Sequence, residues 1–312
     1  MKIALLTNTI NKPGGAEYVI LSMFEALLSF DNIDIYGREK LDPKLLQLWV
    51  DEPILNELIK HYHHLPKFPQ NLNILMKYDL VINTRSNEVL APAHVHYLHW
   101  IFSPWGVKDP ETLWYYRNAY GISGEIDLRY VMRHLMHYLQ VKLSRLVLAN
   151  SRYVANLLKD LGIKAHVLYP PVRVREIMSH VSNAIEKERL VVTISRIDKG
   201  KQLEMLPLVA SKVKHASFIL VGSLANAGYY DYLLKLRKRF NADNFSILIN
   251  LPKEKLYELL GKSLIYLHTA HYEQFGISVV ESMAAGCIPV VHRSGGPYID
   301  ILGGVDGVFG FS

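Results

Sequence analysis

The sequence has little of several features that would narrow its function at once. It contains one cysteine, Cys287, in 312 residues, which excludes an internal disulfide framework and is typical of a reducing compartment. No run of about eighteen apolar residues is present, so we expect no transmembrane helix. The first residues, MKIALLTNTI, lack the long apolar run and cleavage site of a signal peptide and are typical of a first strand. We therefore expect a cytoplasmic protein.

Repeats and several common motifs are also missing. The chain shows no internal repeat of solenoid spacing, no low-complexity tract and no nucleic-acid-binding motif. Its first strand-to-helix loop, NKPGGAE at residues 11–17, is not the G-x-G-x-x-G fingerprint, which weakens an interpretation as an NAD-binding protein. The net charge of +6 favours anionic partners but does not choose among nucleotides, nucleic acid and acidic lipid head groups.

Short apolar runs alternate with helical patterns along the whole chain, and half of the residues are apolar. This alternation predicts an α/β fold whose sheets are mostly parallel, with helices on both faces. Strands are expected first at Lys2–Thr7, Ile33–Tyr36, Leu80–Asn83, His94–His99 and Leu146–Ala149, and then at Leu190–Ile194, Ser217–Val221, Phe245–Ile249, Leu264–His268 and Ile288–His292.

The segment Tyr169-Pro170-Pro171-Val172 interrupts this alternation, because consecutive prolines fix an extended backbone and remove two amide donors. We therefore predict two domains, residues 1–170 and residues 171–312, each built on a nucleotide-binding-like sheet. Ligands of open α/β folds bind at the carboxyl ends of the strands, so functional residues are expected in strand-to-helix loops.

Two glutamates, Glu273 and Glu281, stand eight positions apart around Gly276, which precedes a predicted helix at Ile277–Ala285. A helix N-terminus carries about half a positive charge and unpaired N–H groups, which suits a diphosphate. Carboxylates on either side of that anion are strong acceptors for sugar hydroxyls. The segment thus indicates a nucleotide-sugar site, and a solvated helix surface is the alternative.

Cations and small residues follow the neighbouring strands of the second half. Arg196 and Lys201 share the loop SRIDKGK, where they can neutralise a diphosphate and the charge on a leaving nucleotide. Gly222 ends the next strand and permits close backbone approach to a ligand, and Leu251 follows the strand after it. Solvated turns are the alternative for these positions.

The string HYEQFGISVVESMAAGCIPVVHRSGGP, at residues 271–297, resembles the E-x7-E signature region of glycosyltransferase family 4. Within that family it is most similar to the dolichol-linked oligosaccharide α-1,2-mannosyltransferases and their archaeal relatives. The resemblance implies a GT-B fold, with two Rossmann-like domains facing each other across a cleft, and sugar transfer with retention of anomeric configuration. It is strongest over residues 190–301 and looser over residues 1–170. Family members usually continue into a helix that crosses back to the first domain, whereas this chain stops at Ser312, so we expect a truncated or minimal fold.

For the second domain, the resemblance implies that Arg196 and Lys201 stabilise the leaving diphosphate and that Glu273 holds sugar hydroxyls. It assigns the base to the backbone near Leu251 and the ribose to Glu281. The backbone of Phe275, Gly276 and Ile277 is implied to contact phosphate or sugar. Gly295-Gly296-Pro297 is interpreted as a tight turn.

For the first domain, the resemblance implies that Gly14 and Gly15 line the cleft near the donor phosphates and the acceptor. The segment HYLHWIFSPW resembles the family segment in which a histidine faces the reacting sugar. His99 is accordingly expected to hydrogen-bond the donor sugar or to position the acceptor. A structural core histidine is the alternative.

Histidines crowd two places, and zinc is an alternative for each group. They are His94, His96 and His99, and His61, His63 and His64. Neither group has the fixed spacing and supporting ligands that a zinc site needs, so we predict no metal site.

A basic segment lies between Leu128 and Lys164, where seven lysines or arginines accompany a single acid, Asp160. The interleaved apolar residues of RYVMRHLMHYLQVKL predict an amphipathic helix, with Trp100, Trp105 and Trp114 nearby on the chain. One interpretation is that this helix rests on an anionic membrane surface. A buried helix with a solvated basic side is the other.

The sequence therefore favours an enzyme, a glycosyltransferase that needs no cofactor. We expect a nucleotide sugar as co-substrate, GDP-mannose first and a UDP-sugar second, and a saccharide or lipid-linked acceptor, with the protein cytoplasmic or at the cytoplasmic membrane face. The alternatives are a sugar-nucleotide epimerase of the same fold and a basic nucleic-acid-binding module, whose affinity would fall steeply with salt.

Overall fold

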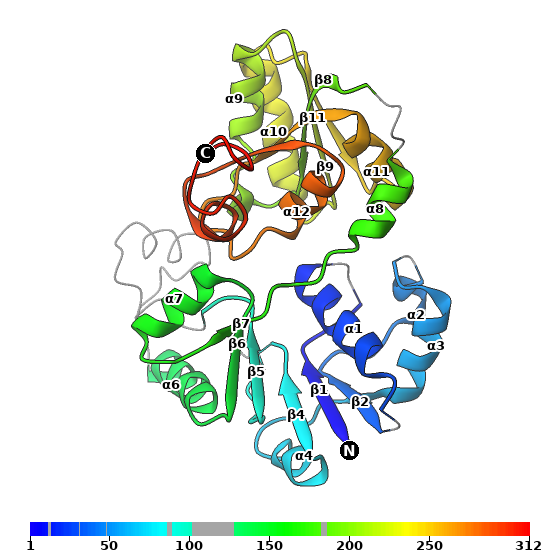
Figure 1. The fold of residues 1–312 in the computed structure, drawn as a ribbon, viewed down its shortest axis with the longest axis vertical. Helices are drawn as coiled ribbons and strands as arrows, with labels where there is room; N and C mark the ends of the chain where they lie inside the picture. Colours follow the sequence, from blue (N-terminus) through cyan, green and yellow to red (C-terminus); the bar gives the residue numbers. More distant parts are fainter. Residues whose placement is uncertain (12–13, 31, 48, 86–88, 102–127, 182–185) are drawn as a thin grey trace. The chain divides into compact units, whose positions relative to one another are not determined.

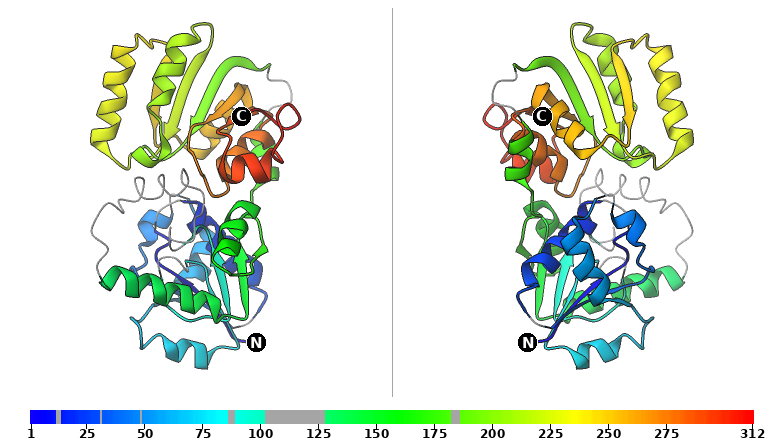
Figure 2. Two further views of the ribbon diagram at one scale, coloured as in Figure 1. Left: turned by 90° about the vertical axis from the view of Figure 1, so that its left-hand side faces the viewer. Right: turned by 90° about the vertical axis from the view of Figure 1, so that its right-hand side faces the viewer.

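The computed structural model describes residues 1–312 except 12–13, 31, 48, 86–88, 102–127 and 182–185, and of residues 128–130 it describes the backbone alone (Figure 1). The described residues divide into two compact units (Figure 2). Unit 1 extends up to Pro171, and unit 2 runs from Val172 to Ser312. The change from one to the other lies within the two-proline segment at residues 169–172.

The described residues of unit 1 form a seven-stranded parallel sheet in the order β3-β2-β1-β4-β5-β6-β7. Its strands are β1 (Ile3–Thr7), β2 (Ile33–Gly37), β3 (Tyr62–His64), β4 (Leu80–Asn83), β5 (Val95–Leu98), β6 (Leu146–Ala149) and β7 (His166–Val167). The helices are α1 (Gly15–Leu27), α2 (Pro43–Leu46), α3 (Glu52–His61), α4 (Leu72–Lys77), α6 (Leu128–Lys142) and α7 (Arg152–Asp160).

The strand order of unit 1 reverses between β1 and β4. From β1 the chain moves outward to β2 and β3, and from β4 it moves the other way to β5, β6 and β7. Right-handed crossovers therefore place helices on both faces of the sheet, and Figure 1 shows α1 to α3 on one side of it and α6 and α7 on the other. On the first face, Ile20 and Phe24 of α1 pack with Leu55 and Leu58 of α3 over the apolar side chains of β1 and β2.

The described residues of unit 2 form a five-stranded parallel sheet in the order β10-β9-β8-β11-β12. Its strands are β8 (Glu188–Ile194), β9 (Ser217–Gly222), β10 (Phe245–Ile249), β11 (Ser263–His268) and β12 (Ile288–Val291). The helices are α8 (Val174–His180), α9 (Met205–Lys212), α10 (Ala227–Arg239), α11 (Lys253–Lys262) and α12 (Ile277–Ala284), with a 3-10 turn η2 (Lys199–Lys201) and a π-helical turn η3 (Pro297–Ile301). Here the order reverses between β8 and β11.

Ten of the strands lie within one or two residues of their predicted bounds, whereas β3, β7 and α8 were not predicted. The two missed strands are short and polar or exposed, because they form the edges of the sheet. Helix α8 lies in the polar segment after the prolines and buries only Ile177. Such elements have no apolar periodicity to detect.

Helix α9 begins only at Met205, after a tight turn. Lys199 to Lys201 form the 3-10 turn η2, and Gln202 takes the left-handed conformation with φ of 52°. The side chain of Asp198 caps this turn by accepting a hydrogen bond of 2.9 Å from the Gly200 amide. Helix α7 is capped in a similar way, because Ser151 Oγ accepts from the Val154 amide at 3.0 Å.

Candidate functional site

The predicted residues of the second domain follow four neighbouring strands of unit 2. Arg196 and Lys201 follow β8, Gly222 ends β9, Leu251 follows β10 and Glu273 follows β11. Because all these strands are parallel, their carboxyl ends meet at the same edge of the sheet. The point of strand-order reversal, between β8 and β11, is where open α/β sheets bind ligands.

Lys201 and Glu273 form an ion pair across this reversal point, from Nζ to Oε2, although they are 72 residues apart in the chain. Two further hydrogen bonds join their loops. Thr269 Oγ1 donates to the carbonyl oxygen of Lys201 at 2.8 Å, and the His271 amide donates to Gln202 Oε1 at 3.2 Å. The loops after β8 and β11 are therefore one connected structure at the candidate site.

The carboxylate of Glu273 is ionised at neutral pH. Burial is the largest single effect and raises its pKa. The charges of Lys201 and His268 and the hydrogen bonds from Lys201 and the Gln274 amide together outweigh burial, so the pKa falls to about 2. The Glu273 side chain is 16% exposed. An incoming anion therefore meets Lys201 already paired and has to compete with Glu273 for it.

Two glycines hold the Glu273 loop in place. The Gly296 amide donates a hydrogen bond of 2.8 Å to the Glu273 carbonyl oxygen. A Cβ atom at Gly295, whose φ is +71°, would lie 2.4 Å from that oxygen, and one at Gly296 would lie 2.3 Å from the Gln274 carbonyl oxygen. This turn is glycine-rich because the chain packs directly against it.

Gly276 caps the N-terminus of α12 in the left-handed conformation, with φ of +92°. Ile277 is the first residue of that helix, and Phe275, just before it, is 8% exposed. A Cβ atom at Gly276 would lie 3.0 Å from Pro297 Cγ. The backbone of residues 275–277 is thus fixed at the helix N-terminus from both sides.

The need for glycine at position 222 is explained by packing within the protein itself and not by a ligand. A Cβ atom at this position would lie 1.7 Å from the Ser195 carbonyl oxygen, so the loop after β8 already uses the close approach. Leu251 is partly buried and packs against the apolar core beside β8 and β11. Among the described residues, the contacts of Gly222 and Leu251 are packing contacts, and none of them directs either residue toward a ligand site.

Among the described residues, Arg196 and Glu281 make no hydrogen bond or ion pair with the Lys201–Glu273 pair. The Arg196 side chain is exposed in the same loop as Lys201. The charges that act on Glu281 are Lys253 and Glu176, and its pKa is raised, chiefly by burial. Within the described part of the chain, no hydrogen bond or ion pair joins Glu281 to Lys201, Glu273 or Arg196.

His268, the last residue of β11, is a site residue that was not predicted. Its Nε2 atom lies 3.9 Å from Glu273 Oε2 and has no hydrogen-bond partner among the described residues. The side chain is 7% exposed, and burial lowers its pKa to about 4, so the ring is neutral at pH 7. The ring stacks on Tyr266, with ring centroids 6.3 Å apart.

The predicted residues of the first domain also lie at strand carboxyl ends, at the reversal point of unit 1. Gly14 caps α1, which starts at Gly15 after β1, and His99 directly follows β5. Between them, after β4, comes Arg85, whose Nη1 donates to Glu17 Oε1 of α1 at 2.9 Å. A Cβ atom at Gly14 would lie 2.3 Å from Glu17 Oε2, so Gly14 makes room for this carboxylate.

His99 is neutral and has one free ring nitrogen. Burial and the charge of Arg85 lower its pKa to about 3, against the opposing effect of a hydrogen bond to the Thr84 backbone. Its Nε2 atom is buried with no hydrogen-bond partner in the described part of the chain. Lys12 and Pro13 of the glycine loop, and Trp105 and Trp114, lie outside the described residues.

The other histidines have structural partners. His94 Nδ1 accepts from the Val81 amide at 3.0 Å, His96 is fully buried, and His63 Nε2 lies 2.9 Å from Asp34 Oδ1. His61 also contacts Asp34, at 3.7 Å, and His64 is exposed at the end of β3. Over the described residues, no group of three or more such side chains is arranged to hold a metal ion.

Three residues that the sequence reasoning passed over share one signal. His268, Arg85 and Lys253 each end or follow a strand that was predicted, and each carries a polar or charged side chain to the functional edge of its sheet. Residues just after a strand were interpreted as site residues only where a family motif was also present. Extending it to every strand would have found all three.

Comparisons with known proteins identify the class of unit 2. Residues 174–309 match the family model described as glycosyl transferases group 1. This span is nearly all of unit 2, and it contains Arg196, Lys201, Glu273 and Glu281. The second unit therefore resembles the group 1 glycosyl transferases over nearly its whole length.

Curated relatives narrow the resemblance. The chain is 30% identical, over 181 residues, to a Dictyostelium discoideum protein named GDP-Man:Man(3)GlcNAc(2)-PP-Dol alpha-1,2-mannosyltransferase, a match that covers 51% of this chain and 36% of that protein. A Neurospora crassa protein of the same name is 33% identical over 167 residues, which are 47% of this chain and 30% of that protein. The chain thus matches about a third of the length of these relatives. The predicted resemblance to this family, and to its mannosyltransferases, is confirmed.

Solved structures show the same fold. HepE of Anabaena in complex with UDP has a TM-score of 0.70 at 19% identity, with 100% of this chain and 85% of that chain covered. WaaG, a glycosyltransferase involved in lipopolysaccharide biosynthesis, has a TM-score of 0.61 at 14% identity, with 95% and 82% covered. Together with the two parallel sheets, this likeness confirms the predicted α/β, GT-B fold with two Rossmann-like domains.

Proposed function

We propose that the protein is a retaining glycosyltransferase that moves a sugar, mannose first among the candidates, from a nucleoside diphosphate to a hydroxyl acceptor. The observation that carries this proposal is the Lys201–Glu273 ion pair at the strand-order reversal of unit 2. It places a phosphate-binding cation and a hydroxyl-accepting carboxylate side by side, within the span that matches the family model.

In this proposal the groups of unit 2 hold the two ends of the donor. Lys201 and the exposed Arg196 take the diphosphate, and the N-terminus of α12 at Gly276 adds its backbone N–H groups. Glu273, ionised because its pKa is about 2, accepts hydrogen bonds from the sugar hydroxyls. Glu281, partly buried one turn inside α12, accepts from the ribose.

The chemical step breaks the bond between the anomeric carbon of the sugar and the diphosphate oxygen. A new bond forms from that carbon to the acceptor oxygen on the same face, and the proton of the acceptor hydroxyl passes to the departing phosphate. The cations stabilise the charge that grows on the leaving group. We propose that His99 of unit 1, neutral and with no partner for Nε2 among the described residues, can accept a hydrogen bond from a sugar hydroxyl.

The printed names of similar proteins guide the choice of substrates. The mannosyltransferase relatives are named for GDP-Man and for an acceptor linked to PP-Dol, and the HepE structure holds UDP. GDP-mannose is accordingly the first donor to try, and a UDP-sugar the second. We propose a saccharide or lipid-linked acceptor, no metal or other cofactor, and action at the cytoplasmic face of a membrane.

Thermal stabilisation by GDP-mannose and by UDP-sugars tests the donor, because a ligand that binds the native state raises the apparent stability. We expect Lys201→Met to weaken binding of the stabilising donor by about tenfold or more, since a charge-assisted contact to phosphate is lost. Lys199→Met is the matched control, because Lys199 is exposed in the same turn. Equal affinity in both variants would rule out the proposed site.

Product analysis then tests the reaction. With donor alone, an epimerase would convert it, whereas the proposed transferase needs an added acceptor. Retention is checked by the anomeric configuration of the product. If the protein instead binds nucleic acid, with affinity that falls steeply as salt rises, and binds no nucleotide sugar, the basic-module alternative holds.

A further inference from the structure

Helix α6 of unit 1 carries a stripe of exposed apolar side chains. Met132, Leu135 and Leu139 are 47%, 44% and 42% exposed, and Leu143, just after the helix, is 80% exposed. Their spacing of three, four and four residues places them on one face, because an α-helix has 3.6 residues per turn. We call Met132, Leu135, Leu139 and Leu143 the α6 stripe.

The opposite face of α6 is anchored in unit 1. Val141 is fully buried, and His137 and Gln140 are 3% and 8% exposed. Gln140 Oε1 accepts from the Ala91 amide at 3.0 Å, and its Nε2 donates to the Val89 carbonyl oxygen at 3.2 Å. These contacts fix the rotation of the helix, so that the α6 stripe has to face outward.

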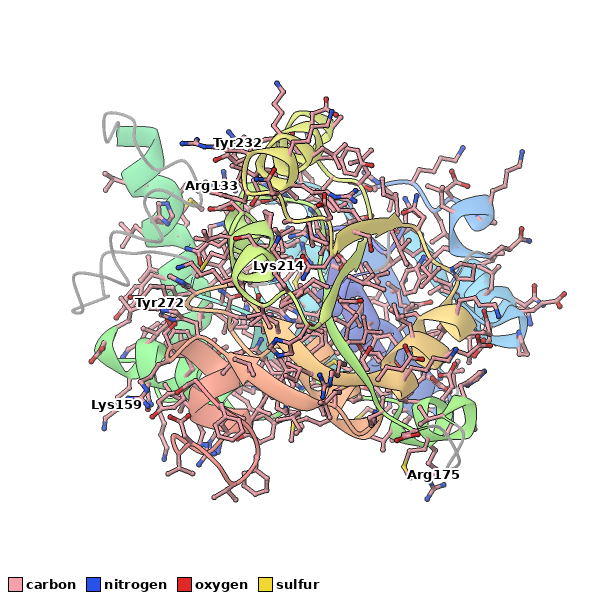
Figure 3. All side chains as sticks on the ribbon, turned by 90° about the horizontal axis from the view of Figure 1, so that it is seen from above. Arg133, Lys159, Arg175, Lys214, Tyr232 and Tyr272 are labelled. Carbon is pink, nitrogen blue, oxygen red and sulfur yellow. The ribbon has the colours of Figure 1, made fainter. Side chains whose placement is uncertain are left out.

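Exposed basic side chains accompany the stripe. Arg133 and Lys142 of α6 and Arg145 just beyond the helix end are exposed, and we call these three residues the basic border. Lys142 Nζ donates to the carbonyl oxygen of Gly162, just after α7, which brings the end of that helix close. Figure 3 shows Arg133 of α6 and Lys159 of α7 on the same side of unit 1.

Basic residues predominate around the stripe. From Leu128 to Lys164 the chain has seven lysines or arginines and a single acid, Asp160. An apolar stripe with a basic border on a helix suits the interface of an anionic bilayer, where the apolar side chains enter the head-group region and the cations contact lipid phosphates. A border of mixed charge would be expected for an ordinary protein partner.

We propose that the α6 stripe and its basic border form a docking surface for an anionic lipid bilayer. No helix in the described part of the chain has the length and apolar character to cross a membrane. This inference deepens the proposed function. It rests on that function in one respect, namely that a lipid-linked acceptor would be met at this surface. Binding to the bilayer itself needs neither donor nor acceptor.

Co-sedimentation with lipid vesicles tests the surface. We expect the full chain to sediment with vesicles of phosphatidylcholine and phosphatidylglycerol, to bind pure phosphatidylcholine much less, and to be released as salt is raised. The double variant Leu135→Ser with Leu139→Ser should lose binding by about fivefold or more. Both side chains are exposed in the wild type, so the variant should keep its fold, which circular dichroism checks.

Matched controls separate this surface from general stickiness. Met76→Ser removes an exposed apolar side chain, 79% exposed, from α4 of the same unit and should change nothing. Arg133→Glu should weaken binding to anionic vesicles and leave the weak binding to phosphatidylcholine as it was.

The proposal is overturned if the wild type ignores anionic vesicles, or if the stripe variant binds them as well as the wild type does. It is also overturned if the stripe instead holds a second copy of the chain, seen as a dimer that the same variant dissociates. Nucleotide binding measured on the same samples keeps the two proposals apart. Vesicle binding without nucleotide binding would contradict the proposed function and leave the proposed docking surface standing.

Discussion

At the scale of the residue, the chemistry of Glu273 is set by its neighbours and not by its type. A buried carboxylate on its own would hold its proton, because burial disfavours the charged form. Lys201 and His268 together with the Gln274 amide reverse this, through charge and hydrogen bonding. The same pairing occupies Lys201, so in the proposed function a donor would have to exchange one partner of each side chain for another.

The lowered pKa of Glu273 links the stability of unit 2 to acid pH. Because the folded pKa of about 2 lies below the usual glutamate value of 4.5, the ion pair stabilises the fold fully above about pH 4.5 and loses this contribution as the pH falls toward 2. Between these values, the wild type should lose roughly 2–3 kcal/mol of unfolding free energy more than Glu273→Gln. Denaturant unfolding at a series of pH values measures the difference, and parallel curves for the two proteins would contradict it.

In the proposed function, His268 would replace Lys201 as the partner of Glu273 when a diphosphate engages Lys201, because its Nε2 atom lies 3.9 Å from Glu273 Oε2. His268→Leu removes the ring nitrogen near Glu273 Oε2, so we expect about tenfold weaker donor binding, the range of one hydrogen bond to a charged group. His268→Gln, which keeps an amide donor, should restore most of the affinity. Donor titration by thermal shift or calorimetry gives the constants.

We expect His268 to affect donor binding through its contact with Glu273, and a double-mutant cycle tests this. In a Glu273→Gln background, His268→Leu should have little further effect on donor binding. A loss as large as in the wild-type background would show that His268 acts on the donor by another route, or only through packing.

At the scale of the element, the strand ends position the site by backbone contact. The loop after β8 stays attached to the edge of β9, because the Ser195 amide donates to the Val221 carbonyl oxygen at 3.0 Å and the Ile197 amide to that of Ser223 at 2.9 Å. Gly222 is the residue that lets the two chains approach. This attachment orients the turn that carries Lys201.

Gly222→Ala should therefore destabilise unit 2 and disturb its site together. The new Cβ atom would lie 1.7 Å from the Ser195 carbonyl oxygen, so backbone has to move, and we expect a loss of about 2–4 kcal/mol. Gly228→Ala, in the first turn of α10, is the control. Its Cβ atom would meet its nearest neighbour at 3.5 Å, so a change of about 0.4–1 kcal/mol toward greater stability is expected. Chemical denaturation measures both, and equal effects would contradict the close-approach argument.

At the scale of the whole molecule, the two units have separate hydrophobic cores. Unit 1 packs apolar clusters on the two faces of its sheet, and unit 2 does the same. Cysteine Cys287 belongs to the core of unit 2, where it donates from Sγ to the Leu260 carbonyl oxygen at 3.2 Å. Each unit thus has the apolar interior that independent folding requires.

We accordingly expect two thermal transitions, of which a bound nucleoside diphosphate raises one. At a concentration about a hundredfold above its dissociation constant, the ligand should shift the transition of unit 2 by roughly 5–10 °C and leave that of unit 1 in place. The variants Leu5→Ala and Leu220→Ala, at fully buried positions of units 1 and 2, assign the transitions in calorimetry. A single transition would contradict this expectation. A ligand-induced shift of the transition that Leu5→Ala assigns to unit 1 would also contradict it.

Much of the fold could be predicted, because a buried parallel strand needs a continuous apolar run whatever its surroundings. This holds for Leu80–Asn83 and Leu146–Ala149, which have their predicted bounds. It fails for β3 and β7, whose pairing with β2 and β6 depends on neighbours distant in the chain. The prolines at 170 and 171 act locally, and the two units divide there.

The sequence alone determined the class of fold, the loops in which the site residues lie and the resemblance to a glycosyltransferase family, because all three depend on local pattern and residue type. Only the tertiary structure decided which side chains meet. It joined Lys201 to Glu273, brought His268 and Arg85 into the two sites and used Gly222 for the chain's own packing. The physical reason is that strand order sets which loops are neighbours, and burial among those neighbours then sets the charge and the partners of each group.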